Sequence, residues 1–198
     1  CAEQLTIEQT VDRIQELAPR LICFVVYGQN PNSGTVNMSG TVVIAKAIKE
    51  RRLNQPVAVV GSHVQALPLQ TIEEQEDIDI VFTNEGVYAL WNILAASDMK
   101  DPNILEDIKG IAFRKNNKAF LTVPEVIVPQ DKMDEHLPGY AWDLLPYKEK
   151  PLDLYRAPMW HADYIEEKRS PYAAIYTSLG CRFRCSFCMI NILNRNDN

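Results

Sequence analysis

Apolar and polar residues follow first a helical and then an extended period at the start of the chain. From Leu5 to Leu17, apolar residues recur at the spacing of an amphipathic helix. Thr6 and Gln9 match the pattern of a capping box at its start. The run from Leu21 to Tyr27 is continuously apolar and rich in strand formers, which is typical of a strand buried on both faces. We therefore predict a helix followed by a central parallel strand.

The same succession of helix and strand patterns continues along the chain. The predicted elements are a polar loop at 28–34, a helix at 41–52, a strand at 57–60, a short helix at 67–74, a strand at 78–82 and a helix at 87–96. Strands that alternate with helices predict an α/β fold with a doubly wound, Rossmann-like (flavodoxin-like) parallel sheet. Such sheets usually begin with a strand, so we expect that a first strand precedes Cys1 and is missing from this chain.

Two further apolar runs, Ile111 to Phe113 and Phe120 to Val123, are separated by a polar stretch at 115–118 that contains two asparagines. Asparagine tolerates the left-handed backbone of tight turns, so this pattern predicts a hairpin that closes the first domain.

Seven of the 12 prolines lie in the stretch from Pro124 to Pro171. This density excludes long regular elements and predicts a connector between two domains. Tyr172 to Thr177 then has the pattern of a new strand. The predicted domains are a Rossmann-like domain at 1–123, a connector at 124–170 and the start of a second domain at 171–198.

Composition and charge exclude several classes of function. The chain has 198 residues, 46% of them hydrophobic, which is enough for one full domain and part of another. Its net charge of −6, with Lys and Arg scattered rather than grouped, argues against nucleic-acid binding. No apolar run is long enough to span a bilayer, and the first residues lack the pattern of a signal peptide. These features predict a cytoplasmic protein without a membrane span.

Three of the five cysteines, Cys181, Cys185 and Cys188, lie within eight residues directly after the strand predicted at 172–177. Such clustering, with Cys1 and Cys23 standing apart, favours metal binding in a reducing compartment over a set of disulfides. Thiolates are the usual protein ligands of iron–sulfur clusters. Three ligands would leave one iron open, and an open coordination position distinguishes a catalytic metal site from a closed structural one.

The stretch from Gly180 to Cys188 resembles the signature of the radical S-adenosylmethionine (SAM) superfamily. The resemblance implies that the three cysteines bind a 4Fe-4S cluster, that SAM binds the open iron and that Phe187 lies against the adenine. It also implies formation of a 5′-deoxyadenosyl radical or an equivalent organometallic intermediate, with flavodoxin or ferredoxin as electron donor and a small molecule as substrate. In this family the cluster loop follows the first strand of a partial TIM-type barrel. We expect the remaining barrel to lie beyond Asn198, so that this chain is truncated at both ends and inactive alone.

The upstream domain resembles the cobalamin-binding domain found in one branch of that superfamily. The resemblance rests on Val59 to His63, Asp79 to Gly86 and Ala141 to Pro146. It implies cobalamin as a second cofactor and methyl transfer as a leading reaction, with rearrangement, ring formation and oxidation left open. Ligands of open parallel sheets bind beyond the carboxyl ends of the strands. Besides the loop at 28–34, the candidate contacts at these ends are Gly61, Ser62, His63, Asn84, Glu85 and Gly86.

Simpler interpretations stand beside these. Any single glycine here is more typical of an ordinary turn, and His63 is equally typical of one. Glu85 is equally typical of a helix N-terminus, where the dipole favours a negative charge. The cysteines could hold a structural zinc ion with His161 as fourth ligand, which would make the protein a zinc-stapled binding module. The sheet domain could also have kept its fold without cobalamin and serve as a platform.

One motif occurs outside its usual context. Asp134 to Gly139 matches Asp-x-His-x-x-Gly, the pattern by which some cobalamin proteins supply an axial histidine to cobalt. That pattern belongs after the first strand of the sheet, whereas this copy lies in the proline-rich connector. We therefore interpret it as a coincidence, and the sequence does not support ligation of cobalt by His136.

Overall fold

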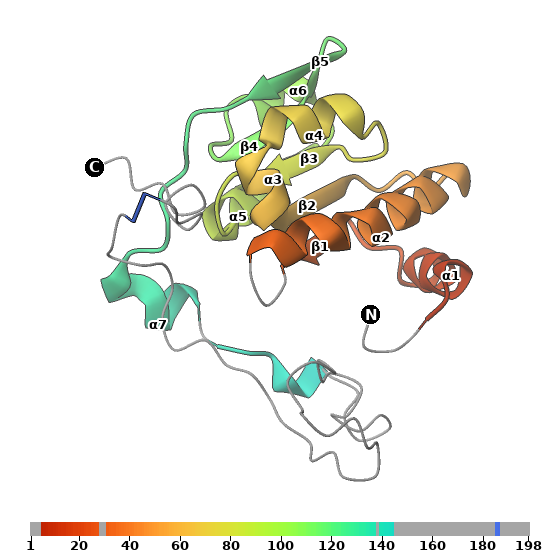
Figure 1. The fold of residues 1–198 in the computed structure, drawn as a ribbon, viewed down its shortest axis with the longest axis horizontal. Coiled ribbons are helices and arrows are strands. Elements are labelled where there is room, and N and C mark those ends of the chain that lie inside the picture. The colour runs from red at the N-terminus through yellow and green to blue at the C-terminus, as the bar shows by residue number, and fades with distance from the viewer. Residues whose placement is uncertain (1–4, 28–30, 138, 145–184, 187–198) are drawn as a thin grey trace.

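The predicted strands form one sheet in a computed structural model that describes residues 5–27, 31–137, 139–144 and 185–186 (Figure 1). The strands are β1 (Ile22–Val26), β2 (Val57–Gly61), β3 (Ile80–Phe82), β4 (Ile111–Lys115) and β5 (Lys118–Leu121), and they lie side by side in that order. β1, β2 and β3 are parallel, whereas β4 and β5 are added antiparallel. The α/β, Rossmann-like fold predicted from the sequence is confirmed.

Helices lie on both sides of this sheet. They are α1 (Ile7–Leu17), α2 (Pro31–Glu50), α3 (Ser62–Ala66), α4 (Pro68–Glu74), α5 (Val87–Ala95), α6 (Pro102–Leu105) and α7 (Met133–His136), with 3-10 turns η1 (Gln130–Lys132) and η2 (Trp142–Leu144). The first four contribute to a core on one face of the sheet, while α5 and α6 pack on the other (Figure 1). Among the described helices, none is both long and apolar enough to cross a membrane.

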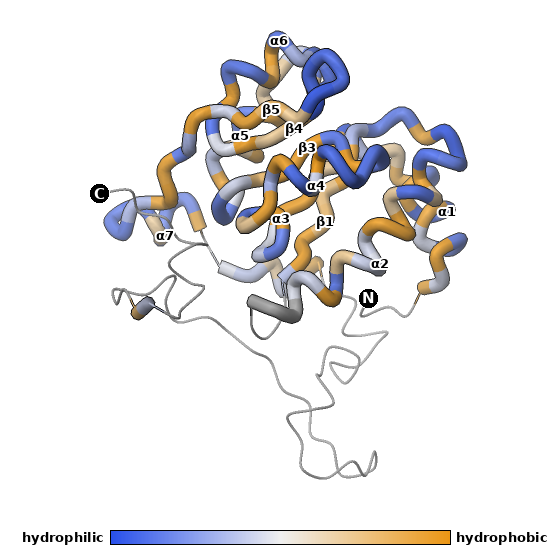
Figure 2. The backbone as a smooth tube through the Cα atoms, turned by 45° about the horizontal axis from the view of Figure 1, so that its top comes forward, coloured by the Kyte–Doolittle hydropathy of each residue, from blue (hydrophilic) through white to orange (hydrophobic). Residues whose placement is uncertain are grey.

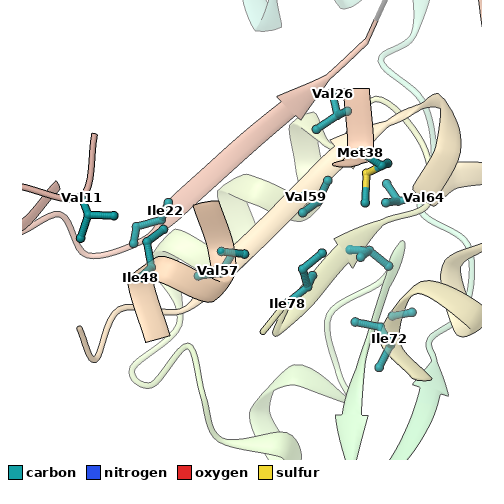
Figure 3. Packing of buried hydrophobic residues seen from close by; sticks show 13 residues of the cluster. Val11, Ile22, Val26, Met38, Ile48, Val57, Val59, Val64, Ile72 and Ile78 are labelled. Atoms are coloured by element: carbon teal, nitrogen blue, oxygen red, sulfur yellow. The ribbon is translucent and has the colours of Figure 1, made fainter. Parts of the chain in front are cut away.

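The alternation of side chains along each strand divides the core in two. Val57 and Val59 of β2 point to the α2 side, where Val59 lies near Met38 and Val64 (Figure 3). Ala58 and Val60 point to the side of α5. Because both faces of β2 are covered, its residues are all buried, and a continuously apolar strand results. Figure 2 shows the same distribution, with hydrophobic residues concentrated on the strands.

Two local predictions, the capping box at Thr6 and the hairpin after Phe113, are confirmed in detail. Thr6 caps α1, since its hydroxyl accepts a hydrogen bond from the Gln9 amide at 3.2 Å while its own amide donates to Gln9 Oε1 at 2.9 Å. The β4–β5 hairpin turns at Asn116 and Asn117, which have φ angles of 51° and 59°. Two successive positive φ angles are the requirement of a type I′ turn.

The prediction of a central first strand is wrong for the described sheet. β1 lies at its edge, next to β2 alone, and Val25 is 71% exposed. An apolar run reports strand-forming side chains, but not how many neighbouring strands cover them. The strand predicted at Tyr172–Thr177, and with it the start of a barrel, lies outside the described residues.

The start of α2 also differs from the prediction. The helix begins at Pro31, not near Thr41, so the predicted loop at 28–34 is helical from residue 31 onward. Gly34 and Gly40 obscure the helical pattern because glycine is a poor helix former. Packing of Met38 into the core stabilises this part of α2 despite that propensity. The short helices α3 and α6 were not predicted.

Candidate functional site

The carboxyl ends of β1 and β2 meet closely. Val26, the last residue of β1, is in register with Gly61, the last residue of β2. A Cβ atom added to Gly61 would overlap the Val26 carbonyl oxygen, and one added to Gly34 would overlap the hydroxyl of Ser62, which is buried. These glycines therefore allow segments of the chain itself to approach one another, which gives Gly61 a structural role whether or not a ligand binds nearby.

Polar side chains from α2, α3 and Tyr27, the residue after β1, gather at this end. His63 Nδ1 lies 3.1 Å from Thr35 Oγ1, so the predicted loop residue His63 is hydrogen-bonded to α2. Gln65 Nε2 donates to the Tyr27 hydroxyl at 2.9 Å, and Asn37 Nδ2 donates to the Tyr27 carbonyl at 3.0 Å. We call these five residues (Tyr27, Thr35, Asn37, His63 and Gln65) the β1–β2 edge group. Their hydroxyl, amide and imidazole groups can donate and accept hydrogen bonds at the protein surface.

The loop after β3 is hydrogen-bonded to another part of the chain, the segment that follows β5. Asn84 Oδ1 accepts from the amide of Gly86, which is the N-cap of α5 and has a φ of 79°. Asn84 Nδ2 donates to the Glu125 carbonyl at 3.0 Å. Glu85 Oε1 accepts from the Val128 amide at 2.7 Å. The candidate residues Asn84 and Glu85 thus bind the segment that follows β5. Glu85 lies just before α5, whose N-cap is Gly86, but its oxygen contacts the connector.

The histidine of the Asp-x-His-x-x-Gly match also attaches the connector. His136, at the end of α7, is hydrogen-bonded through Nδ1 to the Tyr88 hydroxyl at 2.7 Å. Its ring lies 5.5 Å from that of Tyr88, edge to face, and 5.4 Å from that of Trp91. The structure therefore gives His136 a packing role. The interpretation of this motif as a coincidence stays a prediction.

The predicted cluster ligands are almost wholly outside the described residues. Cys181, Cys188, Phe187 and the alternative zinc ligand His161 lie there, and Cys185 is exposed. Among the residues that the structure describes, no three His, Cys, Asp or Glu side chains are grouped so that they could hold a metal ion. The three-cysteine site stays a prediction.

Cys23 has the environment of a core residue. It packs against the cluster of apolar residues on the α5 side of the sheet. Burial raises the pKa of its thiol, because the thiolate would be poorly solvated there. A neutral thiol is a poor metal ligand, in keeping with the separation of Cys23 from the clustered cysteines.

The amino end of the sheet carries structural contacts and a pocket remote from the candidate residues. Asp79 Oδ2 accepts from Lys49 Nζ and from the Val57 amide, each at 2.7 Å, which joins α2 to β2 and the segment before β3. A pocket of about 270 Å³ lies between α1 and α2, lined by Ile7, Glu8, Val11, Ala47, Glu50 and Arg51. Because α2 leads from the carboxyl end of β1 back to the start of β2, this pocket lies at the opposite end from the β1–β2 edge group.

Sequence reasoning missed the contact between α5 and the connector. The sequence feature that could have indicated it is the pair Tyr88 and Trp91. These two aromatic residues lie three positions apart, on the same face of a helix whose other residues are mostly apolar. Trp91 is 55% exposed in spite of its size. An aromatic pair at this spacing marks a helix face that contacts another segment, here α7.

No protein-family model matches the chain. It is 27% identical over 187 residues to the protein named uncharacterized methyltransferase PH0819 of Pyrococcus horikoshii, covering 94% of this chain and 35% of that protein. It is also 27% identical over 146 residues to the cytidylyl-2-hydroxyethylphosphonate methyltransferase of Streptomyces wedmorensis, covering 66% of this chain and 26% of that protein. The chain thus spans about a third or less of the length of these curated relatives.

Two solved structures match part of this chain. One is the cobalamin-dependent SAM radical enzyme OxsB with aqua-cobalamin bound, with a TM-score of 0.49 and 18% identity over 67% of this chain and 17% of that one. The other is the apo, selenomethionine-labelled form of the same enzyme, with a TM-score of 0.48 and 16% identity over 69% of this chain and 19% of that one.

Proposed function

We propose that the whole protein is a radical SAM methyltransferase that uses a 4Fe-4S cluster, SAM and cobalamin. The observation that carries this proposal is the sequence similarity to a protein named as a methyltransferase, which extends over 94% of the chain. A second relative with a methyltransferase name matches two thirds of the chain. Both similarities are to proteins much longer than this chain, so the activity is proposed for the full-length protein.

The cysteine motif supports the radical SAM part of the proposal. Cys181, Cys185 and Cys188 offer three thiolates at a spacing that fits one cluster. With three protein ligands, one iron keeps an open position for the amino and carboxylate groups of SAM. Phe187, between two of the ligands in sequence, is proposed to lie against the adenine of SAM.

The polar groups at the carboxyl end of the sheet fit cobalamin, a flat ring with amide side arms. The exposed side chains of Thr35 and Asn37 and the half-buried ones of His63 and Gln65 offer hydroxyl, amide and imidazole groups that can bind such arms. This is also the end at which open parallel sheets bind their ligands. When bound, cobalamin would supply a carrier for the methyl group. The chain's own residues would hold the ring against the sheet.

A second candidate is a sheet domain that binds no cobalamin and serves as a platform. The observation that favours it is the hydrogen bonding of Asn84 and Glu85 to the chain itself. The two candidates differ in whether the purified full-length protein retains cobalamin.

The test uses the full-length protein, purified without oxygen from cells supplied with hydroxocobalamin and incubated with SAM and a reductant. We expect bound cobalamin in the visible spectrum and release of S-adenosylhomocysteine, the product of SAM that has lost its methyl group. Release of 5′-deoxyadenosine alone from a protein without cobalamin would contradict methyl transfer. Failure to consume SAM at all would contradict the whole proposal.

A further inference from the structure

The segment from 124 to 137, which we call the strap, lies against the sheet domain after β5. Its first part passes the end of β3, where the Glu125 carbonyl accepts from Asn84 Nδ2 and the Val128 amide donates to Glu85 Oε1. Val128 is only 7% exposed. Figure 1 shows the strap leaving β5 and running along one side of the domain to α7. The strap is therefore packed on the domain from its start.

Gly110 allows the strap to pack closely against the sheet domain. Gly110, just before β4, donates to the Val123 carbonyl at 2.8 Å and accepts from the Thr83 amide at 2.9 Å. Its φ is 74°, and an added Cβ would overlap the Cβ of Glu125. Glycine supplies this left-handed conformation and leaves room for the strap at the same position.

The far end of the strap is held by α5. Tyr88 and Trp91 lie on neighbouring positions of one helix face, and the ring of His136 packs against both. The Tyr88 hydroxyl adds a hydrogen bond to His136, whose side chain is 19% exposed. The strap is thus attached at two places, by the loop after β3 and by the exposed face of α5.

The polar groups of the loop after β3 are committed to these contacts. Asn84 uses its side-chain oxygen for the Gly86 amide and its side-chain nitrogen for Glu125. One oxygen of Glu85 accepts from a backbone amide, and a hydrogen bond to a charged acceptor is about twice as strong as a neutral one. A cofactor could take the side-chain nitrogen of Asn84 or this oxygen of Glu85 only by displacing the strap.

We propose that Asn84, Glu85, Tyr88 and Trp91 form a docking strip that positions the connector, and that Glu85 acts on any cofactor site only through the strap. The β1–β2 edge group is then the part of this sheet end that faces a cofactor. The docking strip stands on its own contacts, whereas its relation to the cofactor rests on the proposed function. The four residues are positioning residues that determine where the connector leaves the sheet domain.

The test measures amide hydrogen exchange of the strap in the full-length protein. Glu85→Ala removes the acceptor of the Val128 amide, and we expect exchange in the peptide containing Val128 to accelerate by about tenfold or more, since hydrogen bonds to charged groups contribute about 1.5–3 kcal/mol. Glu85→Gln keeps a neutral acceptor oxygen and should restore part of the protection, since a bond to a neutral acceptor is about half as strong. Glu73→Ala, which removes an exposed carboxylate from α4, is the control and should leave the strap unchanged.

Cobalamin retention by the same variants separates the two roles of Glu85. His136→Ala loosens the strap from its far end, so Glu85→Ala and His136→Ala should retain cobalamin to the same extent. Unchanged exchange of the strap in Glu85→Ala would overturn the docking strip. Loss of cobalamin in Glu85→Ala but not in His136→Ala would make Glu85 a cofactor contact and also overturn the proposal. If the unmodified protein retains no cobalamin, the proposed function fails, while the exchange measurement still decides the docking strip.

Discussion

At the scale of single residues, glycine has two different structural roles in this chain. Gly61 lies where the carboxyl ends of β1 and β2 meet, and a side chain there would overlap the backbone of Val26. Gly40 lies within α2 with nothing within 4 Å of an added Cβ. The sequence alone indicated Gly61 as a candidate ligand contact and gave no role to Gly40. Only the fold distinguishes a glycine required by close packing from one that merely weakens a helix.

This difference predicts opposite effects of the same substitution. Gly61→Ala should lower the free energy of unfolding by about 1–3 kcal/mol, because the obstructing atoms belong to the backbone and cannot move aside cheaply. Gly40→Ala should raise it by roughly 0.5–1 kcal/mol, since alanine is the better helix former. Urea unfolding followed by far-UV circular dichroism measures both. A neutral Gly61→Ala variant would mean that the ends of β1 and β2 are not as closely joined as described.

At the scale of elements, patterns that depend on local chemistry predicted the structure well. The capping box at Thr6 and the hairpin turn at Asn116 and Asn117 involve residues close in sequence, and both are confirmed. The predicted start of α2 and the predicted central position of β1 were wrong. Both depend on contacts with distant segments of the chain. Apolar periodicity reports which residues are buried, but the partner that buries them is set by tertiary packing.

The hairpin turn provides a prediction at this scale. Asn117 has a φ of 59°, which glycine adopts without strain and a β-branched residue does not. Asn117→Val should therefore destabilise the protein by about 1–2 kcal/mol, because a β-branched residue pays the cost of left-handed backbone that asparagine tolerates. Asn117→Gly should be neutral or stabilising. Equal urea midpoints for the two variants would contradict the type I′ turn.

At the scale of the whole molecule, the sequence predicted where the candidate loops lie but not what they contact. Parallel strands place the loops after β1, β2 and β3 at one end of the sheet, as expected from their order. The partners of Asn84 and Glu85 lie 41 and 43 residues further along the chain, and no local pattern indicates them. The end of the sheet is therefore divided between the β1–β2 edge group and the docking strip for the connector.

The same division explains how the sheet domain and the cysteine motif would work together in the proposed enzyme. The strap contacts the loop after β3, and in the sequence it precedes residues 181–188, which carry the predicted cluster ligands. Its docking would fix the start of the connector relative to a cofactor held at the sheet. This arrangement depends on the proposal that those three cysteines bind a catalytic 4Fe-4S cluster.

The most direct test is anaerobic iron–sulfur reconstitution of the full-length protein beside a variant with Cys181→Ala, Cys185→Ala and Cys188→Ala, followed by visible and EPR spectroscopy. We predict a brown, reducible cluster whose EPR signal changes on addition of SAM and which is absent from the variant. A colourless protein that instead takes up zinc through the same cysteines would contradict it and identify a zinc-stapled binding domain.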